Sequence, residues 1–386
     1  MGLSTAPPMN GSLASELIEL GRRAGLTAVG VCRADPFART EEILVQRKEE
    51  GLHGGMQFTY RNPARSTNPA RILPDAAALV VGALDFWRGQ PPPPDDGLPY
   101  GRVAAYARQD HYTALRDRLK QVADRLGEKG FQAVVVADEN HLVDRAAAYR
   151  AGLGWWGKSA NLLLPEAGSL VVLGAVVTDA PLCEEDPPPM EDGCGSCRQC
   201  LDGCPTGAIV APGVVDARRC LAWLVQQKGV FPAEYRVELG DRIYGCDDCA
   251  EVCPPNRIRV RLDGRRRSNG SGQAWVSLVD LLESSDEELM ARFGRWYIPR
   301  RQPRYLRRNA LVALGNVGDP SEPRVRSVVG QALGDSDPLV RAHAVWCARR
   351  LGLELTPLRG RNDPLVQEEL QRPVTARLTR GSATSQ

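Results

Sequence analysis

Eight cysteines between positions 194 and 253 constrain this chain more than any other feature of its sequence. The first four follow the pattern C-x-x-C-x-x-C-x-x-x-C-P, and the last three follow C-x-x-C-x-x-x-C-P, with one cysteine between the two runs. In chain order they are Cys194, Cys197, Cys200, Cys204, Cys220, Cys246, Cys249 and Cys253. Closely spaced thiolates ending in C-P are typical of bacterial proteins that bind [4Fe–4S] clusters. Eight thiolates are the number that two such clusters require.

The spacing also predicts how the thiolates are shared. Three thiolates at two-residue intervals can wrap one face of a cube, but the fourth must come from elsewhere. In two-cluster ferredoxins the last cysteine of such a run binds the other cluster. One cluster is therefore predicted on Cys194, Cys197, Cys200 and Cys253. The other is predicted on Cys246, Cys249, Cys204 and Cys220, where Cys220 supplies the ligand that the second run lacks.

Two other interpretations of the cysteines remain open. A structural zinc site uses two C-x-x-C pairs at a longer separation, which leaves the third closely spaced cysteine and the C-P ending without a reason. A disulfide framework would need an oxidising compartment. Neither explains the pattern as fully as two iron–sulfur clusters do.

The composition fits a multidomain protein of the cytoplasm. The chain has 386 residues, 43% hydrophobic residues and a net charge of +2, which is ordinary for a globular protein. No apolar run approaches the ~20 residues needed to cross a membrane, and the N-terminus lacks the pattern of a secretory signal. We expect no contact with a membrane.

The first 182 residues alternate helical and buried-strand patterns. Helices are predicted over 13–24, 41–55 and 111–130, and strands over 28–35, 76–86 and 131–137. This alternation predicts an α/β domain. In α/β folds ligands bind beyond the carboxyl ends of strands, and Asp138 directly follows the strand pattern QAVVVA.

The segment GLGWWGK at 152–158 is rich in glycine and tryptophan. It fits neither the phosphate-loop pattern nor the dinucleotide fingerprint in its context, because it follows a helical stretch. Its glycines could let the backbone approach a large flat ligand, or they could form a packing turn.

A basic region follows the cysteines. Between positions 257 and 308 there are 13 arginines, no lysine and 6 acidic residues. Trp296, Tyr297 and Tyr305 lie among the arginines, a combination that suits phosphate contacts and base stacking. Arg307 and Ala310 recur 34 residues later as Arg341 and Ala344, which is typical of HEAT helices.

Together these motifs resemble the epoxyqueuosine reductase family. The resemblance rests on GCGSCRQCLDGCPTGAI, RRCLAWLVQQKG, YGCDDCAEVCPPN, AGLGWWGK, PEAGSLVVLG and LRRNALVALGN. It implies a nitroreductase-like α/β domain over 1–182, a ferredoxin-like 2[4Fe–4S] domain over 183–264, a basic HEAT-like tRNA-binding region over 265–372 and a tail over 373–386.

The resemblance also implies a function. Family members are cobalamin-dependent oxidoreductases that reduce epoxyqueuosine to queuosine at the wobble position of tRNA anticodons. Asp138 would donate the proton, and an external donor would supply electrons to a monomeric enzyme. The implied cobalamin contacts are Arg65, Asp138, Leu162, Leu173 and Lys228. The family's D-Y-H segment is His111-Tyr112-Thr113 here, so only its tyrosine is kept, and His141 stands where proline is common.

Two other functions remain open. A corrinoid and iron–sulfur reductase could act on a small molecule, as reductive dehalogenases do. A non-catalytic electron carrier could sit on an RNA-binding scaffold, although an α/β domain of ~180 residues is far more than a carrier needs.

Overall fold

The computed structural model describes residues 12–165, 167–263 and 273–374. The chain forms two compact units, and each is assembled from separate stretches. The first comprises residues 1–89, 110–218 and 248–270, and the second comprises 90–109, 219–247 and 271–386. The contiguous division at 182 and 264 stays a prediction. Most of the predicted tail, 375–386, lies outside the described residues.

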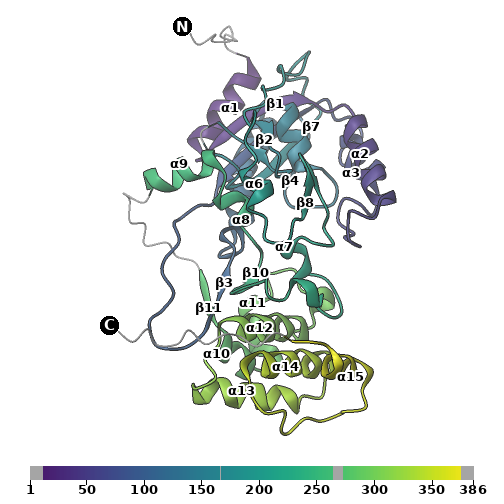
Figure 1. Cartoon of the computed structure of the whole chain (residues 1–386). Coiled ribbons are helices and arrows are strands. Elements are labelled where there is room, and N and C mark those ends of the chain that lie inside the picture. The colour runs from purple at the N-terminus through teal and green to yellow at the C-terminus, as the bar shows by residue number, and fades with distance from the viewer. Residues whose placement is uncertain (1–11, 166, 264–272, 375–386) are drawn as a thin grey trace. The chain divides into compact units, whose positions relative to one another are not determined.

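An antiparallel four-stranded sheet forms the centre of the first unit (Figure 1). Its order is β1-β2-β7-β4, and all three neighbouring pairs run antiparallel. The strands are β1 (Ala28–Arg33), β2 (Ala78–Asp85), β7 (Val171–Thr178) and β4 (Ala133–Val136). Every residue of β2 is buried, which explains why its sequence is a continuous apolar run rather than an alternating one.

Helices cover both faces of this sheet. α4 (His111–Glu128) lies on one face beside α1 (Leu13–Arg23), and α5 (Asp144–Arg150) packs on the other. Gly82 and Gly174 are register partners on the α4 face. A Cβ on either glycine would lie 3.0 Å from the Leu119 side chain, so the paired glycines let α4 sit close to the sheet.

The remaining elements of the first unit lie around this sheet. Two short hairpins occur, β5 with β6 and β8 with β9. The strands are β5 (Trp155–Trp156), β6 (Leu162–Leu163), β8 (Ile209–Ala211) and β9 (Val214–Val215). The helices are α2 (Ala38–Glu49), α3 (Pro63–Ser66), the 3-10 turn η1 (Pro69–Arg71), α6 (Gln199–Asp202), α8 (Asp248–Glu251) and α9 (Pro254–Asp263).

The predicted helices and strands of the N-terminal region are confirmed. The three predicted helices correspond to α1, α2 and α4, and the three predicted strands to β1, β2 and β4. The sheet is antiparallel, however, so the rule that places ligands at the shared carboxyl edge of parallel strands does not apply. Asp138 must be placed by its own contacts.

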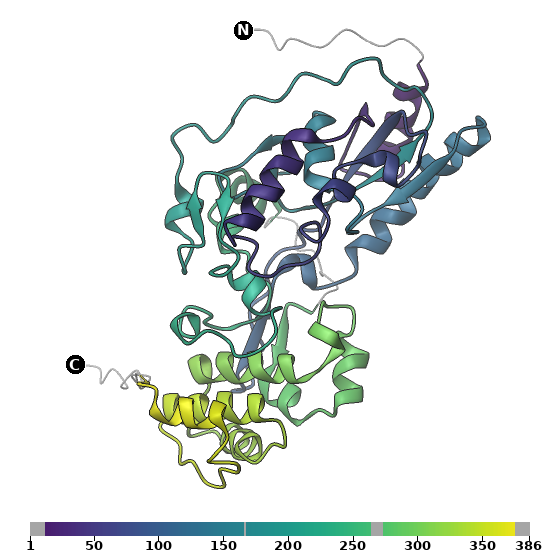
Figure 2. The same cartoon turned by 90° about the vertical axis from the view of Figure 1, so that its right-hand side faces the viewer.

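The second unit joins a small sheet to a set of packed helices (Figure 2). β3 (Tyr100–Val103) pairs in parallel with β10 (Arg242–Tyr244) and antiparallel with β11 (Trp275–Ser277). The short helices are η2 (Ala105–Ala107), α7 (Leu221–Leu224), η3 (Ala233–Tyr235) and η4 (Pro299–Arg301). The longer ones are α10 (Leu278–Glu283), α11 (Asp286–Phe293), α12 (Arg304–Val317), α13 (Pro323–Leu333), α14 (Pro338–Leu351) and α15 (Pro364–Gln371). α12 packs against α14, and α14 against α13 and α15.

Local sequence signals begin these helices. Ser285 and Glu288 form a reciprocal capping box at α11, which satisfies backbone donors that the first turn would otherwise leave unpaired. Asp337 and Asp363 cap α14 and α15, and each is followed by proline in the first helical position. These caps set where the helices of the repeat begin.

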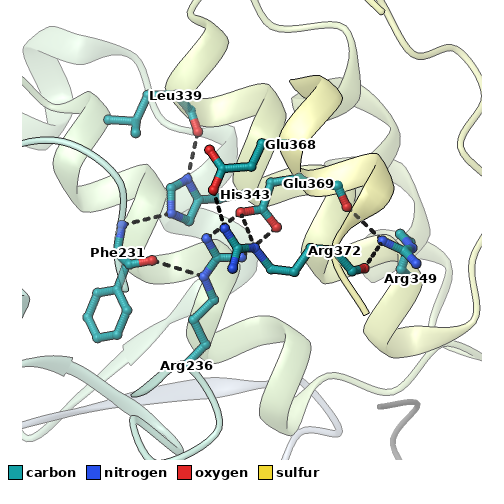
Figure 3. Close-up of polar contacts among 8 residues, drawn as sticks. All are labelled: Phe231, Arg236, Leu339, His343, Arg349, Glu368, Glu369 and Arg372. Carbon is teal, nitrogen blue, oxygen red and sulfur yellow. Dashed lines mark hydrogen bonds and ion pairs between the residues drawn. The ribbon is translucent and has the colours of Figure 1, made fainter. Parts of the chain in front are cut away.

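A buried polar network connects α14, α15 and the residues on either side of η3 (Figure 3). Arg236 donates to both carboxylate oxygens of Glu369 at 2.8 and 2.6 Å, and the two side chains are 0% and 2% exposed. His343 Nε2 accepts from the Phe231 N–H, and its Nδ1 donates to the Leu339 carbonyl. Burial holds the pKa of His343 well below its usual range, in keeping with a neutral ring that can accept. No helix in the described ranges is both long and apolar enough to cross a bilayer.

Candidate functional site

Four cysteines of the first unit lie close together, from two segments distant in sequence. Cys194 and Cys197 precede α6, Cys200 lies within it, and Cys253 follows α8. All four are half-buried free thiols. The pKa of Cys253 is raised to about 11, chiefly by burial, and the other three thiols lie near enough to contribute to the rise. These are the four cysteines that spacing assigned to one cluster.

Lys158 holds the loop that carries the first of these cysteines. Its Nζ donates to the carbonyls of Gly195 and Cys197 at 2.6 and 2.9 Å. The Cys194 N–H donates to Asp192 at 2.8 Å. Lys158 also brings a positive charge to the loop that carries Cys194 and Cys197, which suits a bound cluster of net negative charge. The sequence offered no role for this lysine beyond its place in GLGWWGK.

Asn256 performs the corresponding task for Cys253. It is fully buried and donates to the Ser169 hydroxyl and the Ala250 carbonyl, both at 2.9 Å. Its own Oδ1 accepts from the Ser169 N–H at 2.9 Å. Because the side-chain amide of Asn256 hydrogen-bonds to both Ser169 and Ala250, it fixes the turn after Cys253. Its position after C-P-P was the only sequence signal, and it was missed.

The other four predicted ligands are divided between the units. Cys204 and Cys249 belong to the first unit, and Cys220 and Cys246 belong to the second. Within the second unit, Cys220 and Cys246 both lie near enough to Tyr106 to raise the pKa of its buried hydroxyl. The assignment of the four to one cluster stays a prediction from their spacing.

The zinc interpretation gains no support from the geometry. Among the described residues, no group of three or more His, Cys, Asp or Glu side chains is arranged to hold a single metal ion.

Asp138 occupies a strained turn directly after β4. Its φ is 55°, in the left-handed region that a residue with a Cβ adopts at a cost of about 1–3 kcal/mol. Tyr112 of α4 hydrogen-bonds to its carboxyl, and the Arg116 guanidinium lies close by. Arg65 and Ser66, at the end of α3, both donate to the Asn140 carbonyl two residues on. The Asp138 turn is therefore held from both α3 and α4.

The pKa of Asp138 is raised in spite of these favourable contacts. Partial removal of its carboxyl from water is the largest cause, and the Arg116 charge and the Tyr112 hydrogen bond oppose it. The residue as a whole is exposed, so the proton it keeps is also accessible. Asp144, at the start of α5, is half-buried beside it, and removal of its carboxyl from water and the Asp138 charge hold the pKa of Asp144 well above its usual range. This second carboxyl was not predicted.

The predicted cobalamin contacts differ in accessibility. Leu162 and Leu173 are only 3% and 8% exposed and pack in the core of the first unit. Arg65 is half-buried, and its Nε has no hydrogen-bond partner among the described residues. Lys228 is exposed and belongs to the second unit. Of the four, Arg65 offers a donor free for a ligand next to the Asp138 turn.

The segment GLGWWGK forms a packing turn, which decides between the two interpretations of its glycines. It contains β5, which pairs with β6. A Cβ on Gly154 would lie 2.1 Å from the Leu163 carbonyl oxygen, and one on Gly157 would lie 2.7 Å from the Leu163 side chain. The glycines are needed because the chain itself approaches closely.

The aromatic residues of the basic region divide into buried and exposed. Trp296 and Tyr305 are each 4% exposed, so the prediction that they stack on bases is wrong. Both pack inside the second unit, Trp296 between the rings of Tyr244 and Phe293. Tyr297 is 56% exposed and keeps the predicted accessibility. The segment is irregular, so its sequence gave no period from which to tell the two kinds apart.

The comparisons with known proteins match both regions. Residues 193–256 match a family described as 4Fe-4S double cluster binding domain, and residues 298–370 match HEAT repeats. The epoxyqueuosine reductase of Pseudomonas aeruginosa is 34% identical over 366 residues, which cover 90% of this chain and 97% of that protein.

Solved structures agree. An epoxyqueuosine reductase from Bacillus subtilis, with its catalytic aspartate loop swung out of the active site, is 32% identical with a TM-score of 0.78, covering 93% of this chain and 92% of that one. An epoxyqueuosine reductase with an epoxyqueuosine-modified tRNA-Tyr stem loop has the same identity, TM-score and coverage.

Fold and site together define an iron–sulfur oxidoreductase with two [4Fe–4S] clusters and a C-terminal HEAT-repeat region. The extent of the similarity makes the assignment specific. The chain belongs to the epoxyqueuosine reductase family.

Proposed function

We propose that this protein reduces epoxyqueuosine to queuosine at the wobble position of tRNA anticodons. The observation that carries the proposal is similarity to epoxyqueuosine reductases over about nine-tenths of the chain. One of those relatives has been solved with an epoxyqueuosine-modified tRNA stem loop. The double-cluster and HEAT regions of this chain both lie within that similarity.

The reaction removes one oxygen atom. Both carbon–oxygen bonds of the epoxide break, a carbon–carbon double bond forms, and the oxygen leaves as water after taking up two protons. Two electrons are therefore required, and an external reductant supplies them through the two clusters. Each cluster accepts one electron at a time, which suits delivery in single steps.

The chain's own contribution to the chemistry is the placement of a proton. Asp138 presents an accessible carboxyl whose pKa is raised by partial removal from water, so it keeps its proton to a higher pH than an ordinary aspartate. A general acid works best when its pKa lies near the operating pH. Tyr112 and Arg116 contact this carboxyl, and the nearby Glu139 charge disfavours loss of the proton.

One observation suits a large cofactor with hydrogen-bond acceptors beside Asp138. Arg65 Nε is a buried donor without a hydrogen-bond partner among the described residues. We propose that Arg65, Asp138 and the backbone around Leu162 and Leu173 would hold cobalamin, with Lys228 contributing from the second unit. When bound, cobalamin would supply a strongly nucleophilic reduced cobalt. The chain would hold the substrate epoxide near Asp138 and limit the access of water.

We also propose the ligands of the clusters. Cys194, Cys197, Cys200 and Cys253 bind one cluster, and Cys204, Cys220, Cys246 and Cys249 bind the other. The first set is supported by the proximity of its thiols, since the other three help to raise the pKa of Cys253. The tRNA would contact the basic HEAT-like region, and the enzyme would act as a monomer in the cytoplasm. A reductase of small molecules or an electron carrier is not favoured, because relatives similar over nearly the whole chain are epoxyqueuosine reductases.

The test is mass spectrometry of tRNA nucleosides. Anaerobically purified protein, reduced and supplied with cobalamin, is incubated with tRNA that carries epoxyqueuosine. We expect epoxyqueuosine to disappear as queuosine appears in equal amount. Unchanged epoxyqueuosine, with full iron and cobalt content in the protein, would refute the proposal.

A further inference from the structure

Residues 292–301 present a row of cations and one aromatic ring on the surface of the second unit. Phe293, Trp296, Ile298 and Pro299 are buried, whereas the arginines and the tyrosine among them are exposed. The exposed ones are Arg292, Arg295, Tyr297, Arg300 and Arg301. No Asp or Glu occurs in the sequence between Glu288 and Asp319. The surface of this segment therefore combines positive charge with an accessible ring.

The backbone of Tyr297 is held although its ring is free. Its N–H donates to the Tyr244 hydroxyl at 2.9 Å. The Tyr244 ring stacks on Trp296, with centroids 4.5 Å apart and an angle of 11° between the planes. Trp296 in turn donates from its indole nitrogen to the Ala107 carbonyl. Because the backbone is fixed by buried groups, a ligand that stacks on Tyr297 loses little affinity to ordering of the chain.

Arg300 follows in a strained conformation. It and Arg301 have φ values of 51° and 53°, and such strain concentrates at ligand-binding sites. Arg301 is tied back by a hydrogen bond to the Gly294 carbonyl at 3.1 Å. Arg300 is exposed and forms no hydrogen bond or ion pair with any described residue. Its guanidinium is available for an anion beside the exposed ring.

We propose that Tyr297 and Arg300 bind an unpaired nucleotide of an RNA loop. The tyrosine ring stacks on the base, and the arginine contacts a phosphate of the same strand. A stacking ring beside a guanidinium is how proteins hold single-stranded nucleic acid without reading its sequence. A duplex keeps its bases inside the helix and can use only the arginine. The inference rests on the proposed function, which supplies an RNA loop as substrate, and adds where that loop is held.

The experiment measures binding of two synthetic RNAs to the full chain with its clusters. One is an anticodon stem loop with an unpaired loop, and the other is a duplex of the same length. The variants are Tyr297→Ser, Tyr297→Phe, Arg300→Gln and Arg300→Lys. The control Arg361→Gln removes another exposed arginine of the second unit, whose side chain forms no hydrogen bond or ion pair with a described residue. Iron content and thermal midpoint check that each variant folds.

Tyr297→Ser is expected to weaken binding of the stem loop roughly 5- to 150-fold, the range for loss of one stacked base, and to leave duplex binding unchanged. Tyr297→Phe should restore stem-loop binding, because it keeps the ring. Arg300→Gln should weaken both RNAs and lower the slope of log affinity against log salt by roughly 0.7–0.9, the effect of one phosphate contact. Arg300→Lys should keep most of that slope.

The outcomes separate the two proposals. Wild-type protein that binds the stem loop, with Tyr297→Ser and Arg300→Gln binding it equally well, overturns the inference and leaves the proposed function standing. Equal weakening by Arg361→Gln and Arg300→Gln also overturns it, because the effect is then one of general charge. Wild-type protein that binds neither RNA, but captures an acidic peptide through these residues, overturns both.

Discussion

At the scale of the single residue, Asp138 joins two unfavourable features that serve one purpose. Its left-handed backbone costs free energy, and the pKa of its partly desolvated carboxyl is raised. Tyr112 and Arg116 limit the rise of this pKa. Hydrogen bonds to the Asn140 carbonyl hold the turn that contains Asp138. An acid that stays partly protonated and accessible is suited to give a proton to a leaving oxygen.

The first prediction is that Asp138→Asn keeps the fold and loses turnover. Asparagine fits the same left-handed turn but has no acidic proton, so turnover of epoxyqueuosine tRNA should fall roughly 100- to 10,000-fold. Iron content and thermal midpoint should match the wild type. The control Asp117→Asn changes an exposed carboxyl of α4 and should keep full turnover. Equal activity of the two variants would remove Asp138 from the mechanism.

A second prediction concerns pH. Turnover needs the protonated form of Asp138, so kcat/KM should fall as pH rises through its raised pKa, with a limiting slope of about −1 on a logarithmic scale. The same raised pKa contributes stability that is present below the unfolded pKa of about 3.9 and is lost as pH rises through the folded pKa. Removal of the Asp138 carboxyl from water sets the midpoint, together with Arg116, Tyr112 and Glu139.

The check for this pH dependence is the profile of Glu139→Gln. Removing the Glu139 charge should lower the pKa of Asp138, because the neighbouring carboxylate no longer disfavours its ionisation. The midpoint should then shift to lower pH, with the slope unchanged. A rate that rises with pH in the wild type would mean that Asp138 acts as a base.

Site residues that follow a fixed sequence pattern could be predicted, whereas residues that act through long-range contacts could not. The cysteines and Asp138 follow from spacing and from the end of a strand. Lys158 and Asn256 act through hydrogen bonds to residues distant in the chain, so no local pattern marks them. The exposure of Tyr297 next to buried Trp296 depends on packing that an irregular segment does not encode.

At the scale of the element, the network in Figure 3 ties α15 to the rest of the second unit. Arg236 precedes β10 and Glu369 lies on α15, so the buried ion pair joins segments 133 residues apart. Such pairs stabilise little relative to apolar residues, but breaking one leaves a buried charge without its counter-ion. The pair therefore fixes which surface of α15 faces inward.

A third prediction follows for this pair. Glu369→Ala should lower the free energy of unfolding by about 3–5 kcal/mol, seen as a lower midpoint in denaturant. The neighbouring change Glu368→Ala removes an exposed partner of Arg372 and should cost at most about 1 kcal/mol. The double variant Arg236→Met/Glu369→Leu should lose less than Glu369→Ala alone. A double variant that loses as much would show that the charge left behind is not the cause.

Elements with strong periodicity were predictable, and their pairing was not. α1, α4, β2 and β4 lie where the sequence places them. The antiparallel order of the sheet depends on long-range pairing of β2 with β7, about which a local pattern says nothing. The role of GLGWWGK could not be predicted either, because only the pairing of β5 with β6 shows which atoms its glycines contact.

At the scale of the whole molecule, the chain passes between its two units more than once. Residues 90–109 and 219–247 belong to the second unit although the first unit precedes and follows each. A sequence divided at changes of composition can yield only contiguous domains, so this interleaving could not be predicted. The cysteines show it best, since consecutive members of the pattern fall in different units.

The fourth prediction tests the cluster ligands. Cys253→Ala should reduce bound iron from about eight to about four per chain, because one cluster loses the ligand that comes from a separate segment. The control Cys183→Ala changes another half-buried thiol of the first unit and should keep all of the iron. Iron and acid-labile sulfide are measured on anaerobically purified protein. Full iron in Cys253→Ala would overturn the assignment of the first set.

The distance in sequence between Cys200 and Cys253 has a consequence for how the protein matures in the cell. On the ribosome the first three cysteines emerge well before the fourth, so the earlier cluster can be completed only after that stretch has been synthesised. If the cluster is treated as a single cross-link, closing this loop restricts the unfolded chain by about 4 kcal/mol. We therefore expect iron starvation to lower the abundance of the protein through proteolysis, rather than to leave an intact inactive pool awaiting repair.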